Sequence, residues 1–321
     1  MMRGQATGPT IALHLVVIAA LFAANYVLPE YHRGVFSRVL VLATVAMGYN
    51  ILFGYTGLLS LGHAMFFAVG LYGAGLPLFH LGWGVPLSFV AGIMAGGVMA
   101  AFIGVLALRT TGVAFMIVTM MFAQVFFLAT LYFTTWTRGE EGLVLQQALR
   151  QVDIGGLTIN LTDPSTRYLL ALTLFSIVLM ITLKLVRAPF GRTLIAIREN
   201  EERMRMLGYD VFRTKLSAVI LSGLICASAG AAYALLFGYV GSGFASIQYS
   251  ILPLLWVLLG GAATTLGPLI GTLFMFYVID YTSGITSAYL LLVGAVLIIL
   301  ILFFPKGLLG TVRERWLPWL P

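Results

Sequence analysis

Long apolar runs follow one another along most of the chain, and short polar stretches separate them. A helix needs about 20 apolar residues to cross a bilayer, because each residue adds 1.5 Å to its length. Seven runs before residue 241 approach or exceed that length, and each is expected to form a membrane-spanning helix. They cover residues 10–29, 35–53, 57–80, 85–108, 113–135, 168–186 and 216–240. This pattern predicts an all-α, polytopic membrane protein.

Beyond residue 240 the pattern changes. Two short apolar pieces, 251–259 and 269–281, flank the stretch GGAATTLGP, and a last long run covers 287–304. Each short piece is too short for a relaxed crossing. We therefore expect a broken or re-entrant helical hairpin, since irregular backbone at membrane depth is tolerated only when it is buried in protein or lines a cavity. The expected total is roughly 8–10 transmembrane helices, including the broken segments.

Composition supports the same class. The 321 residues are 60% hydrophobic and 9% charged, with a mean hydropathy of +1.02, whereas a soluble domain carries roughly a quarter charged residues. The net charge of +7 does not indicate nucleic-acid binding, because the basic residues cluster at span ends. The single cysteine, Cys226, leaves no disulfide framework or thiolate metal site. We expect one transmembrane domain over residues 1–321, without a soluble catalytic domain.

The densest polar segment is 187–215, called the island below. Eight of the 18 Lys and Arg residues lie between residues 184 and 215, together with four acids. Such an excess of basic residues predicts a cytoplasmic loop. Counting spans from the island places the loop 136–167 outside and both termini in the cytoplasm. Arg33 and Arg38 are exceptions, offset in part by Glu30.

Within the island, residues 193–207 are expected to form one short amphipathic helix that Gly208 ends in a left-handed conformation. Its apolar face would be buried against lipid, its own protein or a partner. Charges are spaced for three i, i+4 pairs, and that face has four apolar residues. The pairs are Arg198–Glu202, Glu199–Arg203 and Glu201–Arg205, and the face carries Leu194, Ile197, Met204 and Leu207.

Two glycine-rich polar interruptions are candidates for a solute path, because broken helices mark the translocation path in transporters. One is GGAATTLGPLIG at 260–271, and a tight helix-packing corner is the equal alternative there. The other lies within 54–70, where His63 is favoured as a hydrogen-bonded packing residue over a proton relay. Gly92 and Gly96 favour close helix packing. The path candidates are Ser60, His63, Gln124, Gly260, Gly261, Thr264, Gly267 and Pro268.

The sequence contains none of the common motifs for nucleotide binding or for hydrolytic, metal or thiol catalysis. There is no GxxxxGK[ST] for ATP phosphates, and no HExxH, GxSxG or CxxC in a plausible context, so no enzyme is predicted. Asp280 is the only acid within an apparent apolar run, which argues against a proton-driven carrier. A sodium-coupled carrier is less excluded, because backbone carbonyls can bind Na⁺.

Four blocks of the chain resemble one family, in the same order. GYTGLLSLGHAMFFAVGLY (54–72), the island with the following helix (191–235), VLLGGAATTLGPLIGTLF (257–274) and LLVGAVLIILILFFPKGLLG (291–310) are similar to branched-chain amino acid ABC permeases of the LivM/LivH type. The match is closer to LivM. It implies a permease in the bacterial inner membrane that pairs with a second homologous permease, two cytoplasmic ATPase subunits and a periplasmic solute-binding protein. It implies no cofactor on this chain, with ATP and Mg²⁺ used by the ATPases.

The resemblance also assigns roles. The island becomes the loop that couples to the ATPases, and EERMRMLG (201–208) is similar to the importer "EAA" pattern, although Arg203 and Met204 replace its alanines. WTRGEEGL (136–143) resembles an outer-loop element in which Arg138 replaces a glycine, beside Glu140 and Glu141. The coupling residues implied are Arg192, Ile197, Arg198, Glu199, Glu201, Glu202, Met204 and Gly208.

The solute implied is a branched-chain amino acid or a related small polar solute, such as another amino acid, urea, an amide or an aromatic acid. Few charges lie within the spans, so we expect a weakly selective path, with specificity in the binding protein. The alternative function is a stand-alone secondary carrier or channel, in which the island is only a solvated loop.

Overall fold

The computed structural model describes residues 7–154, 157–286, 288–304 and 306–315, and they are mostly helical. Within that part of the chain, seven helices are long and apolar enough to cross a membrane, which confirms an all-α, polytopic membrane protein. They are α1 (Thr7–Val27), α2 (Glu30–Asn50) with its extension to Tyr55, α4 (Val85–Ala107), α5 (Val113–Tyr132), α7 (Pro164–Arg187), α10 (Val211–Phe237) and α12 (Gly267–Ile285). Three shorter helices complete the bundle: α3 (His63–His80), α11 (Gln248–Gly260) and α13 (Tyr289–Phe303). Residue 287, where the last span was expected to begin, lies outside the described residues.

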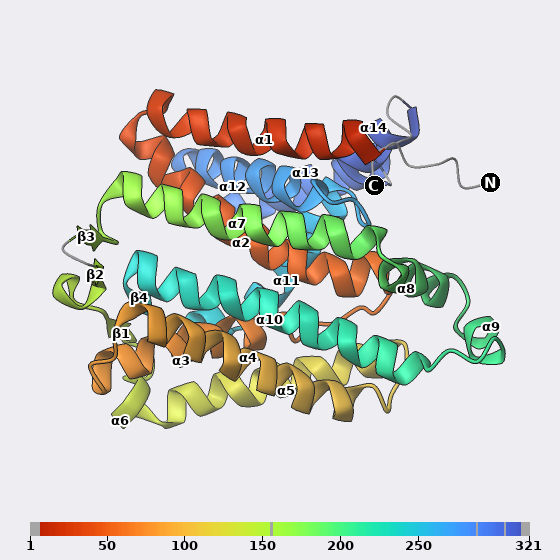
Figure 1. The fold of residues 1–321 in the computed structure, drawn as a ribbon, viewed down its shortest axis with the longest axis horizontal. Coiled ribbons are helices and arrows are strands. Elements are labelled where there is room, and N and C mark those ends of the chain that lie inside the picture. Colours follow the sequence, from red (N-terminus) through yellow and green to blue (C-terminus); the bar gives the residue numbers. More distant parts are fainter. Residues whose placement is uncertain (1–6, 155–156, 287, 305, 316–321) are drawn as a thin grey trace.

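The long helices run side by side, so the bundle has two distinct ends (Figure 1). The short helices α8 (Pro189–Glu199), α9 (Glu201–Met206) and α14 (Gly307–Arg315) lie at one end, called the island end. The short strands lie at the other, called the loop end. The predicted loop 136–167 and the island are therefore on opposite ends, as the span count requires.

Helices α2 and α10 form the centre of the bundle. Both are largely buried, whereas only a small part of α1 and of α5 is buried. Helices α3 and α4 pack on α10 at very short range, because glycines remove the side chains in the way. A Cβ on Gly96 would lie 2.0 Å from that of Ala227, and one on Gly230 would lie 1.9 Å from the carbonyl oxygen of Phe67. The predicted packing role of Gly96 is thus confirmed.

The first interruption follows α2. A π-helical turn, Ile51–Tyr55, extends α2, and residues 56–62 are not helical. Helix α3 begins at His63, whereas the third span was expected to start at residue 57. The helix is therefore shorter at its N-terminus than predicted. The backbone N–H of Leu61 donates to Thr119 Oγ1 of α5 at 3.2 Å, and that of Ala64 donates to Ser250 Oγ of α11 at 3.0 Å. Neighbouring helices thus satisfy the backbone groups that the break releases.

The second interruption separates α11 from α12. The two helices pack against each other and are joined by the non-helical residues 261–266, which confirms a broken helical hairpin. Helix α11 has only 13 residues. Helix α12 has 19, so the prediction that both pieces are too short to cross was wrong for the second piece. The apolar pattern missed the two ends of this helix, because it begins with Gly267 and Pro268 and its last turn contains Thr282, Ser283 and Gly284.

The loop end carries the few strands. Strand β1 (Leu143–Val144) pairs antiparallel with β4 (Tyr239–Val240), and β2 (Gln151–Ile154) pairs with β3 (Leu157–Asn160). Short helical turns precede them, α6 (Thr134–Thr137) and η2 (Gln147–Arg150), and η3 (Ser242–Ala245) follows β4. Asp163 caps α7 by accepting the backbone N–H of Thr166 at 2.9 Å, and this hydrogen bond holds the pKa of its carboxyl below the usual range.

Candidate functional site

The island folds into two helices rather than one. Helix α8 ends at Glu199, Asn200 is extended with φ −159°, and its side chain caps α9 by accepting the N–H of Arg203 at 2.8 Å. The single helix predicted over 193–207 was therefore wrong. Asn200 provides the physical reason, because a short amide side chain competes with the helix for backbone donors and favours a new N-terminus. Gly208 adopts φ +84°, which confirms the predicted left-handed stop.

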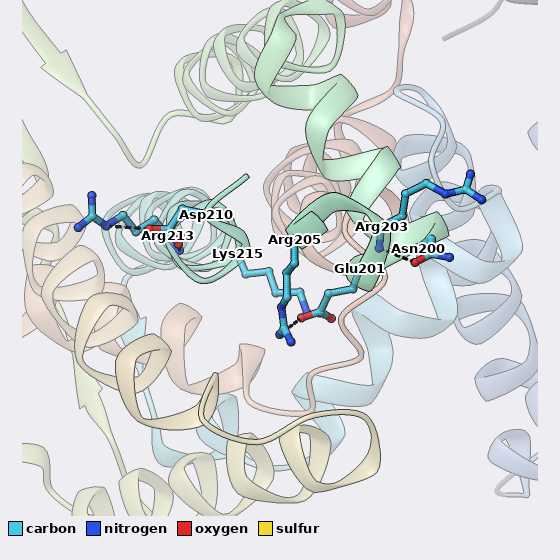
Figure 2. Close-up of polar contacts among 7 residues, drawn as sticks. All are labelled: Asn200, Glu201, Arg203, Arg205, Asp210, Arg213 and Lys215. Carbon is cyan, nitrogen blue, oxygen red and sulfur yellow. Dashed lines mark hydrogen bonds and ion pairs between the residues drawn. The ribbon is translucent and has the colours of Figure 1, made fainter. Parts of the chain in front are cut away.

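Glu201 ties the middle of the island to its C-terminal end (Figure 2). Its carboxylate lies 2.5 Å from Arg205 of α9 and 2.5 Å from Lys215 of α10, and the Lys215 side chain is only 11% exposed. The predicted pair Glu201–Arg205 is confirmed. The other two, Arg198–Glu202 and Glu199–Arg203, are absent from the ion pairs of the described residues, because Asn200 interrupts the helical spacing that they need.

The island has a buried inner side and an exposed apolar tip. Ile197 and Met204 pack with Val211 in a small cluster, and Leu194 is fully buried, so these parts of the predicted apolar face are confirmed. Leu207 is not part of it, since α9 ends before it and it is 66% exposed. Four large apolar side chains form the tip: Met206, Leu207, Tyr209 and Phe212. Sequence reasoning missed three of them, although an apolar MLGYDVF run inside a charged loop was a usable signal.

The remaining coupling candidates differ in what they contact. Arg198 is exposed, and its guanidinium donates to the carbonyl oxygen of Gly54 in the π-helical turn before the first interruption. The Arg198 side chain also packs against Gly57, because a Cβ on Gly57 would lie 2.8 Å from Cγ of Arg198. A cation at the carbonyl end of a helix is favourable. Arg192, Glu199 and Glu202 are exposed.

The second interruption is held from two sides. Asn50 of α2 donates from Nδ2 to the carbonyl of Thr264 at 2.9 Å and accepts from the N–H of Ala263 at 3.0 Å. Arg313 of α14 donates to the carbonyl of Ala263 at 3.1 Å. A cavity of about 610 Å³ at the island end lies between these contacts. Its lining is Phe53, Arg198, Leu258, Ala262, Thr264, Lys306, Gly310, Arg313 and Glu314. The π-helical turn, the second interruption, α8 and α14 therefore all contribute residues to the lining of one cavity.

His63 and Ser60 are buried beside the first interruption. His63 Nε2 lies 2.8 Å from Ser222 Oγ, which in turn donates to the carbonyl of Gly48 at 2.7 Å. This chain of contacts links α3 to α10 and α2, and it shows that His63 is buried and hydrogen-bonded. Ser60 Oγ accepts the N–H of Gly62 at 3.2 Å.

The other path candidates divide into two groups. Those of the second interruption are buried and form its turn: Gly260, Gly261 with φ +115°, Thr264, Gly267 and Pro268. A Cβ on Gly260 would lie 1.9 Å from the carbonyl oxygen of Gly267. Gln124 is different, because it is exposed on an otherwise apolar face of α5.

The outer-loop candidates lie at the loop end. Arg138 has φ 58°, in the left-handed region that favours glycine, and its guanidinium lies over the ring of Phe79 at 5.3 Å. Glu140 and Glu141 are exposed. The Glu141 carbonyl accepts a hydrogen bond from the Tyr239 hydroxyl at 3.3 Å, beside the β1–β4 pair.

Residues 33–303 match the family model described as the permease component of the branched-chain amino acid transport system. The chain belongs to this family. It is thus a non-enzymatic permease component of an ABC transport system, as predicted. No solved structure matches the chain.

Curated relatives are similar over different lengths. The chain is 26% identical to the high-affinity branched-chain amino acid permease LivM of Escherichia coli, over 96% of this chain and 77% of that protein. It is 29% identical to a probable LivM of Methanocaldococcus jannaschii, over 39% of this chain and 41% of the relative. It is also 28% identical to the L-arabinose permease AraH of Azospirillum brasilense, over 68% and 64% of the two chains.

Proposed function

We propose that this chain forms, with a second homologous permease, the inward path of an ABC importer for branched-chain amino acids or a related small polar solute. Two cytoplasmic ATPase subunits power it, and a periplasmic binding protein delivers the solute. The chain itself binds no cofactor, and ATP and Mg²⁺ are used by the ATPases. The family match supports the permease role, and the match to LivM supports the solute class. We place the chain in a bacterial inner membrane. Its island end and both termini face the cytoplasm.

The observation that carries the proposal is the exposed apolar tip of the island. Met206 is 84% exposed and Leu207 66%, and basic residues surround them. Apolar side chains gathered outside the bundle on a charged segment are typical of a protein interaction site. If the island were only a solvated loop, as in the alternative function, these exposed apolar side chains would have no role. We assign the tip to contact with an ATPase subunit.

The contacts behind the tip form a route from the ATPase to the solute path. Glu201 ties α9 to α10, and Ile197 and Met204 tie α8 to α9. Arg198 then reaches the first interruption, while Arg313 and Asn50 hold the second. A displacement of the island would therefore act directly on the first interruption through Arg198, whereas the second is held by α2 and α14. Such segments deform at lower cost than intact helices, which suits them to switch access between the two sides.

Gln124 supports a partner on the α5 side. An exposed amide in the middle of a span would lie in hydrocarbon if α5 faced lipid, at a cost of several kcal/mol. The apolar residues that share its face include Met121, Val125 and Leu128. We place this face against the second permease, with Gln124 available to the solute path between the two chains.

The test is assembly of the complex with substituted island tips. Leu207→Ser and Phe212→Ser should reduce the ATPase that co-purifies with the chain by at least about fivefold, because each removes an exposed apolar contact at the centre of an interface. Val144→Ser, a 65% exposed strand residue at the loop end, is the matched control and should retain full assembly. Equal ATPase recovery in all three variants would refute docking at the tip.

A further inference from the structure

Four arginines gather on the loop-end side of the bundle, where the positive-inside rule leads us to expect few basic residues. Arg33 and Arg38 belong to α2, Arg150 to η2 and Arg167 to α7. Together they are called the arginine cluster. None of them takes part in the ion pairs of the described residues. A basic cluster outside the cytoplasm is contrary to the positive-inside pattern, so it needs another reason.

The C-terminal end of α10 organises the cluster. The guanidiniums of Arg38 and Arg167 lie over the ring of Phe237, at 5.6 and 5.5 Å from its centre. Arg150 donates to the carbonyl of Leu236 at 3.3 Å. Burial lowers the pKa of the Arg150 guanidinium, and repulsion from Arg167 adds to the effect. Arginine nevertheless stays protonated at neutral pH, so the cluster concentrates positive charge.

Three of these side chains donate hydrogen bonds to the protein, and the fourth, Arg38, donates none to a described residue. Arg33 donates to Ser165 Oγ at 3.0 Å, Arg167 donates to the carbonyl of Thr162 at 3.0 Å, and Arg150 serves the α10 carbonyl. Their Nε atoms are buried without a partner. Arg38 makes no hydrogen bond or ion pair to any described residue, although it touches the Phe237 ring.

The position of Arg38 is unusual for an arginine. It lies eight residues beyond Glu30, about 12 Å along α2 from the loop end. Most of α2 is buried, yet Arg38 is exposed. Tyr233 and Tyr249 are near enough to interact with it electrostatically. A guanidinium at such a depth is costly in lipid, so we expect the space that it reaches to hold water or solute.

We propose that Arg38 is the contact for a carboxylate of the solute at the outer entrance of the path, with the aromatic rings of Phe237, Tyr233 and Tyr249 around it. A guanidinium presents paired N–H donors that match a carboxylate, and an unpaired one holds them ready. The inference rests on the proposed transport function. It favours amino acids and other carboxylate-bearing solutes over urea or neutral amides.

A labelling experiment tests the site without the rest of the transporter. The full chain in membrane vesicles is treated with phenylglyoxal, and modification at Arg38 is read by mass spectrometry. L-leucine or acetate should slow modification of Arg38 several-fold, and L-leucinamide, which lacks the carboxylate, should not. Equal rates with all three compounds would overturn the proposal, whatever the outcome for ATP-driven transport.

Transport by the reconstituted complex tests the role. With labelled L-leucine on its binding protein, Arg38→Gln should lower uptake per ATP hydrolysed by at least about tenfold, the loss expected when a charged hydrogen bond is removed. Stimulated ATPase activity should stay within about twofold. Arg38→Lys should recover part of the uptake. The control is Arg109→Gln, which replaces an exposed arginine just after the C-terminal end of α4 and should behave as wild type.

Each other result has a definite meaning. Unchanged uptake in Arg38→Gln would overturn the proposal. A joint fall of uptake and ATPase activity with weaker binding-protein affinity would overturn it as well, because Arg38 would then contact the binding protein. A wild-type complex without ATP-dependent uptake would instead refute the proposed function and leave the labelling result to decide on the carboxylate site.

Discussion

Asn50 offers the sharpest test of how the second interruption is held. Its side chain is 1% exposed and makes two hydrogen bonds, to the carbonyl of Thr264 and the N–H of Ala263. Asn50→Leu keeps a similar volume but leaves both backbone groups buried and unpaired. Each unpaired group costs about 1–3 kcal/mol, so we expect a loss of about 2–6 kcal/mol in the free energy of unfolding. With an unfolding entropy of about 2 cal/mol/K per residue, this lowers Tm by about 3–9 °C.

The chain provides its own probe and control for this measurement. Cys226 is the only cysteine and is fully buried, so a thiol-reactive dye reports unfolding in detergent without engineering. Asn25 is buried to a similar degree, at 4% exposure, but its Oδ1 has no partner. Asn25→Leu should therefore leave Tm unchanged or raise it. If the two variants melt at the same temperature, the two hydrogen bonds of Asn50 do not hold the interruption.

Two further predictions concern packing and the island. Gly230→Ala should lower Tm by several degrees, because its Cβ would lie 1.9 Å from a backbone carbonyl of α3, while Gly34→Ala, with open space around it, should be neutral or slightly stabilising. Glu201→Gln should speed tryptic cleavage in α9 several-fold, since Lys215 loses its carboxylate partner. Glu199→Gln, which removes an exposed acid outside the ion pairs of the described residues, should cleave at the wild-type rate, and equal rates for both would show that Glu201 does not hold α9.

The spans were predictable from sequence because hydrocarbon imposes one strong requirement, a long apolar helix. The helix boundaries that were predicted wrongly are those where a polar side chain, rather than the apolar pattern, decides where a helix begins or ends. Asn200 split the island helix by capping a new one, and α12 tolerates Asp280 because that carboxylate accepts a hydrogen bond from Tyr31 at 2.7 Å near the loop end. Tyr31 is 249 positions from Asp280, so no local pattern could show that contact. Asn200 lies only three residues before Arg203, and it is a local capping signal that the apolar pattern alone does not contain.

The candidate residues follow the same rule. The glycine-rich interruptions were visible as composition, and Gly208 as a left-handed stop. What holds the interruptions was not visible, because Asn50 is 214 positions from Thr264 and Arg198 is 144 from Gly54. Arg38 was noticed only as a topological exception, and its relation to Phe237 required the fold.

The central claim is that ATPase subunits at the island drive solute through this chain. Uptake of labelled L-leucine into proteoliposomes tests it most directly, with the two permeases, the ATPases and the loaded binding protein present. The account predicts uptake only with ATP on the island side of the membrane, and its loss in Leu207→Ser. Uptake by the permeases alone, driven by an ion gradient and unaffected by Leu207→Ser, would contradict it and identify a secondary carrier.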